Sequence, residues 1–395
     1  MDMARPLRLL TFSTLFPDSA RPSHGVFVEN RLRHLVASGH ATSTVLAPVP
    51  WFPSTNPRFG TYARYAAVPR FEHRHGLDVH HPRYAVLPAI GMNIAPHLLY
   101  AAVRPALARL IRRGLQFDAI DAHYLYPDGV VAGWLGAAFK TPVVITARGS
   151  DVTELPDHAT PNRLIRAAIQ SATHLIGVSA ALCARMIELG ADPACVTTLR
   201  NGVDITVFHP IDRAAARAAL GLTRRTLISV GHLIPRKRNH LIIQALAELP
   251  DIDLILIGEG PERTRLAALV AELGLGLRVR FLGARPHHDL KRDYTAADAM
   301  VLASSREGWA NVLLESMACG TPVIASNIPG NREIVQTPAA GRITADNTPA
   351  SFAAAIRDLF ATEPDRAATL AYALPFSWAA TTEGQLAIFR HVTGR

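Results

Sequence analysis

Two glutamates separated by seven residues, Glu307 and Glu315, are the residues of this 395-residue sequence whose type and spacing best suit chemistry. Glu307 lies in a glycine-containing loop after an apolar run, and Glu315 lies about one turn inside the helix that the pattern predicts from Asn311 onwards. Backbone N–H groups at a helix start favour phosphate, and Gly308 lets a ligand approach the backbone closely. The two carboxylates can therefore address different parts of one extended ligand.

The spacing of the two glutamates also fits a plainer interpretation. A carboxylate in a loop is usually solvated, and a glutamate inside a helix usually lies on its surface. On spacing alone, this interpretation is the favoured one for both Glu307 and Glu315. A binding role therefore needs support from the rest of the sequence.

The elements that must position these residues are short apolar runs that alternate with amphipathic stretches. The runs with strand character are 7–12, 43–47, 119–122, 143–146 and 175–178 in the first half, and 226–230, 254–257, 279–282, 299–302 and 322–325 in the second. The amphipathic stretches include 27–38, 163–172, 240–249 and 263–273. This alternation predicts an α/β fold with parallel sheets covered by helices.

The two series of strands are broken near residues 201–210, which predicts two doubly wound, Rossmann-like domains that face each other across a cleft. We expect the domains to span residues 1–203 and 204–375. Residues 376–395 have the pattern of a helix with Trp378, Leu386 and Phe389 as apolar anchors, and we expect this helix to pack back on the N-terminal domain. Ligands of such sheets bind at the carboxyl ends of the strands, so the cleft is the expected active site.

The composition argues against several classes of protein. Charged residues make up 18% and hydrophobic residues 49%, which argues against long disordered stretches. The three cysteines lack the paired spacing of metal ligands, so neither a zinc site nor a disulfide framework is expected, and a reducing cytosol fits. The net charge of +9 comes mainly from dispersed arginines without a nucleic-acid-binding motif, so the expected anionic partners are phosphates or a membrane surface, and no nucleic acid.

The segment from Glu307 to Ala325 resembles the signature of family-four retaining glycosyltransferases of the GT-B fold. Its two glutamates enclose seven residues, and residues 317–325 read Met-Ala-Cys-Gly-Thr-Pro-Val-Ile-Ala. The resemblance implies that Glu307 contacts the transferred sugar near its reacting carbon and that Glu315 binds the ribose hydroxyls of a nucleotide-diphosphate-sugar donor. The loop residues implied in donor binding are Gly308, Trp309, Ala310 and Asn311.

A second segment, residues 230–237, resembles the strand and loop with which this family presents basic residues to the donor diphosphate. The resemblance implies that Lys237 and Arg236 stabilise the departing diphosphate, and it adds Gly231 and His232 to the donor site. The family often has arginine where His232 stands, which implies a weaker or pH-sensitive clamp. Without the family, a lysine at this position is more often a solvated surface charge.

Further segments extend the resemblance over nearly the whole chain. Residues 199–204 resemble the interdomain segment of the family, and residues 281–285 resemble the segment that cradles the nucleotide base. The pair Gly258 and Gly260 resembles a turn of the family, although an ordinary tight turn explains a lone Gly-x-Gly equally well.

The acceptor-side residues implied by the resemblance are Gly25, His123, Arg148 and Asp151. Gly25 would let its loop approach a phosphate or the acceptor. His123 is either a sugar-contacting residue or a satisfied buried histidine. Many relatives have histidine where Arg148 stands, and this arginine suits an anion but is no general base. Asp151 either binds sugar hydroxyls or pairs with Arg148.

The family implies transfer with retention of configuration, with neither a metal ion nor a cofactor. Glu307, Lys237 and Arg236 are then the catalytic residues, and residues 204–375 form the nucleotide-sugar-binding domain opposite an acceptor-side domain. Two other functions stay open: another GT-B reaction, such as that of an epimerase or a phosphorylase, and a donor-binding protein without catalytic activity. The departures at Arg148 and His232 motivate the second of these.

The acceptor is expected to be a glycan or a lipid-linked molecule of polysaccharide assembly. A mixture of aromatic and basic residues in the first domain could rest on anionic lipid, or it could be a loop with a scattered charged face: Trp51, Phe52, Arg58, Tyr62, Arg64, Tyr65, Arg70, Phe71 and Arg74. Residues 85–103 carry no charged side chain but are interrupted by proline and glycine, so we expect a buried or membrane-facing helix rather than a membrane span. The expected location is the cytoplasm, with peripheral contact at the inner face of the membrane.

Overall fold

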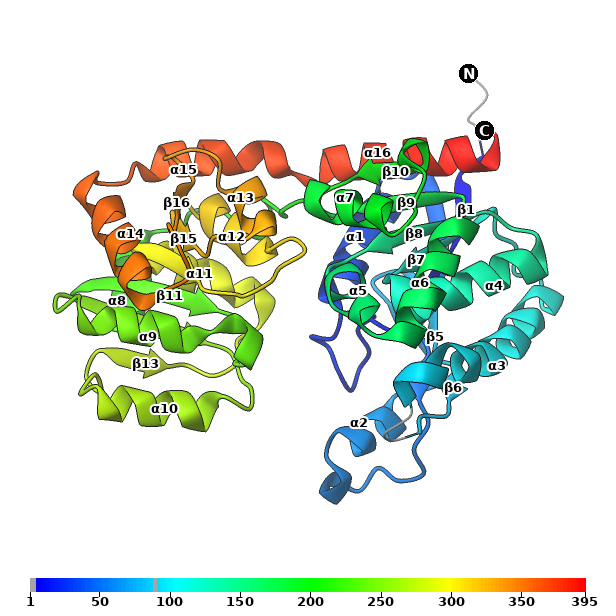
Figure 1. Cartoon of the computed structure of the whole chain (residues 1–395), viewed down its shortest axis with the longest axis horizontal. Helices are drawn as coiled ribbons and strands as arrows, with labels where there is room; N and C mark the ends of the chain where they lie inside the picture. Colours follow the sequence, from blue (N-terminus) through cyan, green and yellow to red (C-terminus); the bar gives the residue numbers. More distant parts are fainter. Residues whose placement is uncertain (1–4, 88–90) are drawn as a thin grey trace. The chain divides into compact units, whose positions relative to one another are not determined.

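The computed structural model describes residues 5–87 and 91–395 and divides into two compact units. The N-terminal unit comprises Met1–Asn201 and Ala379–Arg395, and the C-terminal unit comprises Gly202–Trp378. In both units, strands and helices alternate along the chain (Figure 1).

The N-terminal unit is built on an eight-stranded sheet of order β10-β9-β8-β7-β1-β2-β5-β4. Its strands are β1 (Leu7–Phe12), β2 (Ala41–Leu46), β4 (Phe71–Arg74), β5 (Leu77–His80), β7 (Ala119–His123), β8 (Val143–Ala147), β9 (His174–Gly177) and β10 (Val196–Thr198). All neighbouring pairs are parallel except β4 and β5. The chain leaves β1 towards β2 and returns to its other side with β7, so a topological switch point lies between β1 and β7.

The principal helices of this unit are α1 (Val26–Ala37), α3 (Gly91–Arg112), α4 (Val130–Phe139), α6 (Ala159–Ser171), α7 (Ala180–Glu188) and α16 (Trp378–Thr393). In α16, the buried side chains of Leu386 and Phe389 join the apolar cluster of Leu7, Leu9 and Leu35. Residues 91–103 of the uncharged stretch form the first part of α3, and residues 88–90 lie outside the described part. Within the residues that the structure describes, no helix is long and apolar enough to cross a bilayer.

The C-terminal unit is built on a six-stranded parallel sheet of order β13-β12-β11-β14-β15-β16. Its strands are β11 (Arg225–Val230), β12 (Ile252–Ile257), β13 (Val279–Phe281), β14 (Ala299–Leu302), β15 (Val323–Ala325) and β16 (Gly341–Ile343). Its main helices are α8 (Arg213–Leu220), α9 (Asn239–Ala247), α10 (Arg263–Glu272), α11 (Leu290–Ala296), α12 (Asn311–Ala318), α14 (Pro349–Ala361) and α15 (Arg366–Ala373). The switch point lies between β11 and β14, the strands that precede the two segments with predicted donor residues.

Candidate functional site

The donor-side candidates meet where β11 and β14 end. Lys237 Nζ lies 2.7 Å from Glu307 Oε1, and Arg236 Nη1 lies 3.3 Å from the same oxygen. The side chain of Glu307 is only 11% exposed, so it is not the solvated loop carboxylate of the plainer interpretation. Burial acts to raise the pKa of Glu307, but the charges of Lys237 and Arg236 prevail and hold that pKa below its usual range.

Hydrogen bonds to backbone carbonyls hold the two loops against each other. The N–H of Ser305 donates to the carbonyl of Arg236 over 2.9 Å, and Arg236 Nη1 donates to the carbonyl of Arg306 over 2.8 Å. Arg238 adds bonds to the carbonyls of Ala303 and Ser304, at 2.8 and 3.0 Å. The basic loop and the glutamate loop therefore form one locally braced structure.

Three glycines let backbone segments approach this loop pair. A Cβ atom on Gly330, in the short helix α13 (Pro329–Ile334), would lie 2.6 Å from the carbonyl oxygen of Glu307. A Cβ on Gly258 would lie 1.9 Å from the carbonyl oxygen of Gly231, and one on Gly260 would lie 2.3 Å from that of Leu233. The Gly-x-Gly pair therefore serves as a tight turn that supports the basic loop, one of the two interpretations left open by the sequence.

Glu315 is a buried residue of α12 rather than a surface residue, with 7% exposure. Its Oε2 accepts a hydrogen bond from the hydroxyl of Tyr294 at 3.1 Å, and its Oε1 lies 3.0 Å from His287 Nε2. Burial acts to lower the pKa of His287, but the hydrogen bond and charge of Glu315, together with the charge of Asp204, raise it overall. The ring of Phe208 packs edge-on against His287 at 4.9 Å.

The other predicted donor residues lie around this centre in different ways. Gly308 and Ala310 are buried, and Asn311 is the first residue of α12, as the sequence predicts. His232 is exposed beside the basic loop. Trp309 is only 7% exposed, and its ring packs 6.3 Å from that of Phe376, so its indole serves the packing of the unit.

On the N-terminal unit, His123 at the end of β7 and Arg148 after β8 form one buried network. Arg148 Nη2 lies 2.7 Å from His123 Nδ1, and Arg148 Nη1 donates to Asn201 Oδ1 at 3.0 Å. Because arginine has no acceptor, His123 Nδ1 must accept, which fits a neutral ring. Burial and the charge of Arg148 lower the pKa of His123, despite Asp121 Oδ2 at 3.3 Å from its Nε2.

The network extends to a second arginine, which lies in no recognisable motif of the sequence. Arg31 of α1 is fully buried and donates to Asn201 Oδ1 at 3.2 Å and to the carbonyl of Leu199 at 3.1 Å. Burial and the neighbouring charge of Arg31 lower the pKa of Arg148 to about 9. Arg148 also lies over the ring of Phe27, with its Cζ 5.3 Å from the centroid. The guanidinium of Arg148 is therefore held in a buried site by these contacts and is not a solvated charge.

Asp151 and Gly25 both stabilise the backbone around them. The carboxylate of Asp151 is fully buried and accepts from the backbone N–H groups of Leu125, Arg148 and Gly149, at 2.8, 3.1 and 2.7 Å. Its contact with Arg148 is thus to the main chain, not the side-chain pair that the sequence suggested. Gly25 has φ 70°, and a Cβ there would lie 2.2 Å from the carbonyl oxygen of Leu15, so close packing of its own loop requires the glycine.

Models of two protein families together match most of this chain. Residues 24–207 match "Glycosyltransferase Family 4", and residues 212–373 match "Glycosyl transferases group 1". The chain belongs to glycosyltransferase family four. The junction between the two matched regions lies close to the boundary between the two units, at residues 201 and 202.

Among curated relatives, this family-four chain is similar to D-inositol 3-phosphate glycosyltransferases. It is 33% identical to that of Mycolicibacterium gilvum (strain PYR-GCK) over 293 residues, which are 68% of this chain and 65% of the relative. It is also 33% identical to that of Mycobacterium tuberculosis (strain CDC 1551 / Oshkosh) over 303 residues, 70% of this chain and 62% of the relative. The match thus covers slightly less than two thirds of these relatives' own length.

Solved structures identify the fold as GT-B. The sucrose-phosphate synthase of Thermosynechococcus elongatus aligns with a TM-score of 0.78 at 21% identity, covering 98% of this chain and 99% of that one. Anabaena HepE in complex with UDP aligns with a TM-score of 0.73 at 22% identity, covering 96% and 98%. The predicted pair of doubly wound, Rossmann-like domains of the GT-B class is therefore confirmed.

The family-four signature locates the two glutamates and the basic loop but not their partners. His287 and Tyr294, which hold Glu315, follow the segment 281–285 and were not selected from the sequence. Asp128 was not selected from the sequence, yet it is fully buried and accepts from the backbone N–H of Thr14 at 2.7 Å. Burial raises the pKa of Asp128 to about 7. Only packing distinguishes such a residue from an ordinary loop aspartate.

Proposed function

We propose that this chain is a retaining glycosyltransferase that moves a sugar from a nucleotide-diphosphate-sugar to an acceptor hydroxyl. The observation that carries the proposal is the pairing of Glu307 with Lys237 and Arg236 where β11 and β14 end. This is the edge of a parallel sheet where ligands bind, beside the switch point. The two cations that hold Glu307 can share their positive charge with an incoming diphosphate. The carboxylate of Glu307 then stays fixed beside the sugar.

In the proposed reaction, Lys237, Arg236 and the N-terminus of α12 stabilise the departing diphosphate. These groups supply the positive charge on which a diphosphate leaving group depends, so the proposed transfer uses no metal ion. The bond from the anomeric carbon to the phosphate oxygen breaks, and the bond to the acceptor oxygen forms on the same face of the sugar. The proton of the acceptor hydroxyl passes to the leaving phosphate oxygen.

The two glutamates have separate tasks in this proposal. Glu307 contacts the transferred sugar close to its reacting carbon, and Glu315 accepts hydrogen bonds from the ribose hydroxyls. The buried position of Glu315 supports this division, because Tyr294 and His287 fix its carboxylate before any ligand arrives. The relatives support a sugar nucleotide as donor, since solved HepE complexes contain UDP and UDP-glucose.

A panel of donors tests this function. The purified protein is incubated with UDP-, GDP- and ADP-sugars, and release of the nucleotide diphosphate and the anomeric configuration of the product are measured. We expect turnover of one donor class with retention of configuration. Binding without turnover would favour the inactive donor-binding protein, and an epimerised sugar or release of sugar phosphate would favour another GT-B reaction.

The acceptor proposal is a lipid-linked or glycan molecule reached at an anionic membrane surface. Exposed aromatic side chains support it, namely Trp51 (58%), Tyr62 (45%) and Phe71 (49%). Helix α2 (Thr61–Ala67), which carries Tyr62, projects from the body of its unit (Figure 1). Arg58, Arg64 and Arg70 are exposed in the same stretch, whereas Arg74 is paired with Glu29 at 3.0 Å and contributes less free charge.

Vesicle co-sedimentation tests this surface. We expect wild-type protein to sediment with vesicles that contain phosphatidylserine and to remain in solution with pure phosphatidylcholine, because arginines and interfacial aromatics bind anionic headgroups. Replacing both Trp51 and Tyr62 by alanine is expected to lower bound protein at least about threefold, in line with lost interfacial burial. Sedimentation that does not depend on anionic lipid would contradict the membrane proposal and leave the transfer reaction untouched.

A further inference from the structure

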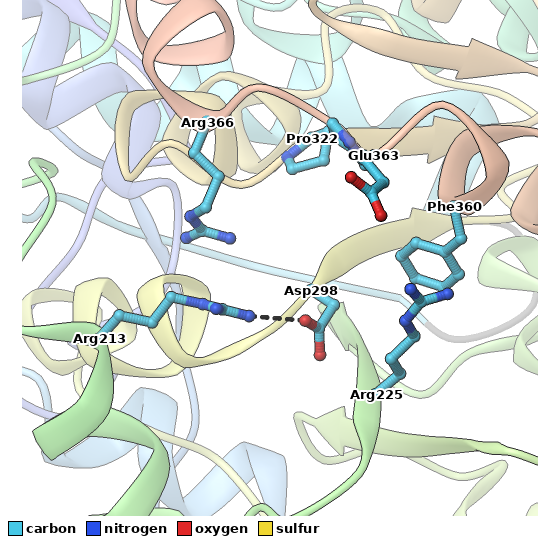
Figure 2. Close-up of a pocket in the computed structure, with 8 residues that line it drawn as sticks. Arg213, Arg225, Asp298, Pro322, Phe360, Glu363 and Arg366 are labelled. Atoms are coloured by element: carbon cyan, nitrogen blue, oxygen red, sulfur yellow. Dashed lines mark hydrogen bonds and ion pairs between the residues drawn. The ribbon is translucent and has the colours of Figure 1, made fainter.

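A pocket lies on the C-terminal unit at the amino-terminal ends of β11, β14 and β15. It has a volume of about 390 Å³ and is lined by Arg213, Arg225, Asp298, Pro322, Phe360, Glu363, Pro364 and Arg366. Because parallel strands share their direction, this edge of the sheet is opposite to the one where Lys237 and Glu307 meet. Figure 2 shows the side chains of Arg213, Arg225 and Arg366 around Asp298.

The carboxylate of Asp298 is already satisfied by protein groups. Its Oδ1 accepts from Arg213 Nη2 at 2.6 Å, and its Oδ2 accepts from Arg217 Nη1 at 3.0 Å and from the backbone N–H of Thr226 at 2.8 Å. Two arginines therefore share this one carboxylate. Asp298 has little capacity left to neutralise the remaining arginines of the pocket.

Those remaining arginines carry charge without a carboxylate partner among the described residues. Arg366 directs Nη1 and Nη2 to carbonyl and hydroxyl oxygens, and burial together with the charge of Arg213 lowers its pKa to about 10. Arg225 is exposed and lies over the ring of Phe360, with its Cζ 5.2 Å from the centroid. The lining places three arginines against the carboxylates of Asp298 and Glu363, so one positive charge is in excess next to an apolar wall.

We propose that this pocket binds a hydroxylated phosphate monoester of the sugar-phosphate class. Arg225 supplies free donors that can form a forked contact with phosphate, and Arg366 supplies a fixed positive charge. Phe360, Pro322 and Pro364 form apolar walls for the carbon skeleton. The carboxylate of Glu363 accepts hydrogen bonds from the ligand's hydroxyl groups, which distinguishes a sugar phosphate from inorganic phosphate.

Arg366 links this pocket to the helices of the proposed donor site. Its Nη2 donates to the carbonyl of Thr295 at 3.0 Å and to that of Cys319 at 3.3 Å, at the C-terminal ends of α11 and α12. These helices carry Tyr294 and Glu315, which bond to each other. A bound phosphate that draws on Arg366 therefore changes donor affinity. This coupling rests on the proposed function, whereas binding in the pocket does not.

Isothermal titration with glucose 6-phosphate and with inorganic phosphate tests the pocket. We expect saturable, one-to-one binding of glucose 6-phosphate that is at least about tenfold tighter than that of inorganic phosphate, and that UDP does not displace. Equal affinity for the two probes would overturn the assignment of the ligand class, and displacement by UDP would overturn the separate site. Absence of saturable binding would overturn the proposal altogether.

Two exposed arginines provide matched variants for this titration. Arg225→Gln removes the free fork, and Arg357→Gln changes an arginine of α14 outside the pocket that contacts the backbone carbonyl of Glu248. We expect glucose 6-phosphate to bind at least about tenfold more weakly to the first variant and unchanged to the second. Wild-type affinity in Arg225→Gln would contradict the assignment. A change in UDP affinity on adding glucose 6-phosphate tests the coupling separately.

Discussion

At the scale of single residues, the two glutamates are held by different chemistry. Glu307 has two cationic partners within 3.3 Å, Lys237 and Arg236. Glu315 instead has the hydroxyl of Tyr294 and the ring of His287. A permanent charge pair suits a group beside a diphosphate, while neutral or titratable donors suit a group that must accept from hydroxyls. Their surroundings therefore support the division of labour that we propose.

The pairing of His287 with Glu315 predicts a pH-dependent contribution to stability. Because the folded state raises the pKa of His287, its stabilisation is fully present below the ordinary histidine pKa and is lost as the pH rises through the raised value. We expect His287→Gln to lower the melting temperature more at about pH 5.5 than at about pH 9. A difference from wild type that stays constant or grows with pH would contradict the assignment.

At the scale of elements, the loops after β11 and β14 are braced by close backbone packing. Gly330 in α13 approaches the carbonyl of Glu307, and its φ is not in the left-handed region. Its replacement therefore tests space alone, free of backbone strain. Gly276 offers a matched control, because a Cβ there would meet no atom within 4 Å.

We expect Gly330→Ala to push the Glu307 loop away and to cost about 1–3 kcal/mol of stability, the usual range for overpacking. Sugar transfer is expected to fall at least about tenfold, since a small displacement of a positioning group is enough for such a loss. Gly276→Ala should leave both quantities within about 0.5 kcal/mol and about twofold of wild type. Denaturant unfolding and initial rates measure the two effects, and a fully active Gly330→Ala enzyme would show that this contact has no role in the site.

The sequence predicts the long, apolar elements well and the short, polar ones poorly. Each of the ten predicted strands exists, because buried parallel strands are continuous apolar runs. The strands that were missed are only two to four residues long and none of them is a long apolar run: β3 (Val49–Pro50), β4, β5, β6 (Arg83–Tyr84), β10 and β16. The start of α12 at Asn311 was predicted, because the loop glycine before it and Gly320 after it delimit the helix.

The sequence predicts the residues of the candidate site that belong to the family signature, but not the residues that hold them in place. Glu307, Glu315 and Lys237 stand in segments with recognisable spacing, so their proximity to a common sheet edge could be expected. His287, Tyr294 and Arg31 come from distant parts of the chain, and only tertiary packing brings them to their partners. The structural roles of Asp151 and Gly25 also depend on backbone geometry, which the spacing of residues in the sequence does not reveal.

At the scale of the whole molecule, the chain returns to its first unit at the end. Helix α16 contributes Leu386, Ile388 and Phe389 to the cluster that contains Leu7 and Leu9 of the central strand β1. The N-terminal unit therefore consists of two chain segments, because the last residues of the chain complete its core, whereas the C-terminal unit is one continuous segment. A substitution in α16 can then weaken one unit without touching the donor residues of the other.

Replacing Phe389 by alanine tests this organisation. Phe389 is fully buried, so we expect a loss of about 3–5 kcal/mol in the N-terminal unit, the usual cost of emptying such a position. Ile187→Ala, on an exposed position of α7, is expected to change stability by less than about 1 kcal/mol. Denaturant unfolding gives the stabilities, and UDP affinity of the folded variants should match wild type. A large loss of UDP affinity in folded Phe389→Ala protein would contradict this separation.

Glu307 and Lys237 form the reactive part of the proposed donor site. The most direct measurement compares initial rates of sugar transfer for wild type, Glu307→Gln, Lys237→Ala and the control Glu272→Gln, whose glutamate is exposed on α10. We expect at least about a hundredfold loss in each of the first two variants, the scale of removing a charge-stabilising group. The control should retain full activity, with circular dichroism confirming that all variants are folded. Wild-type rates in Glu307→Gln or Lys237→Ala would contradict the account.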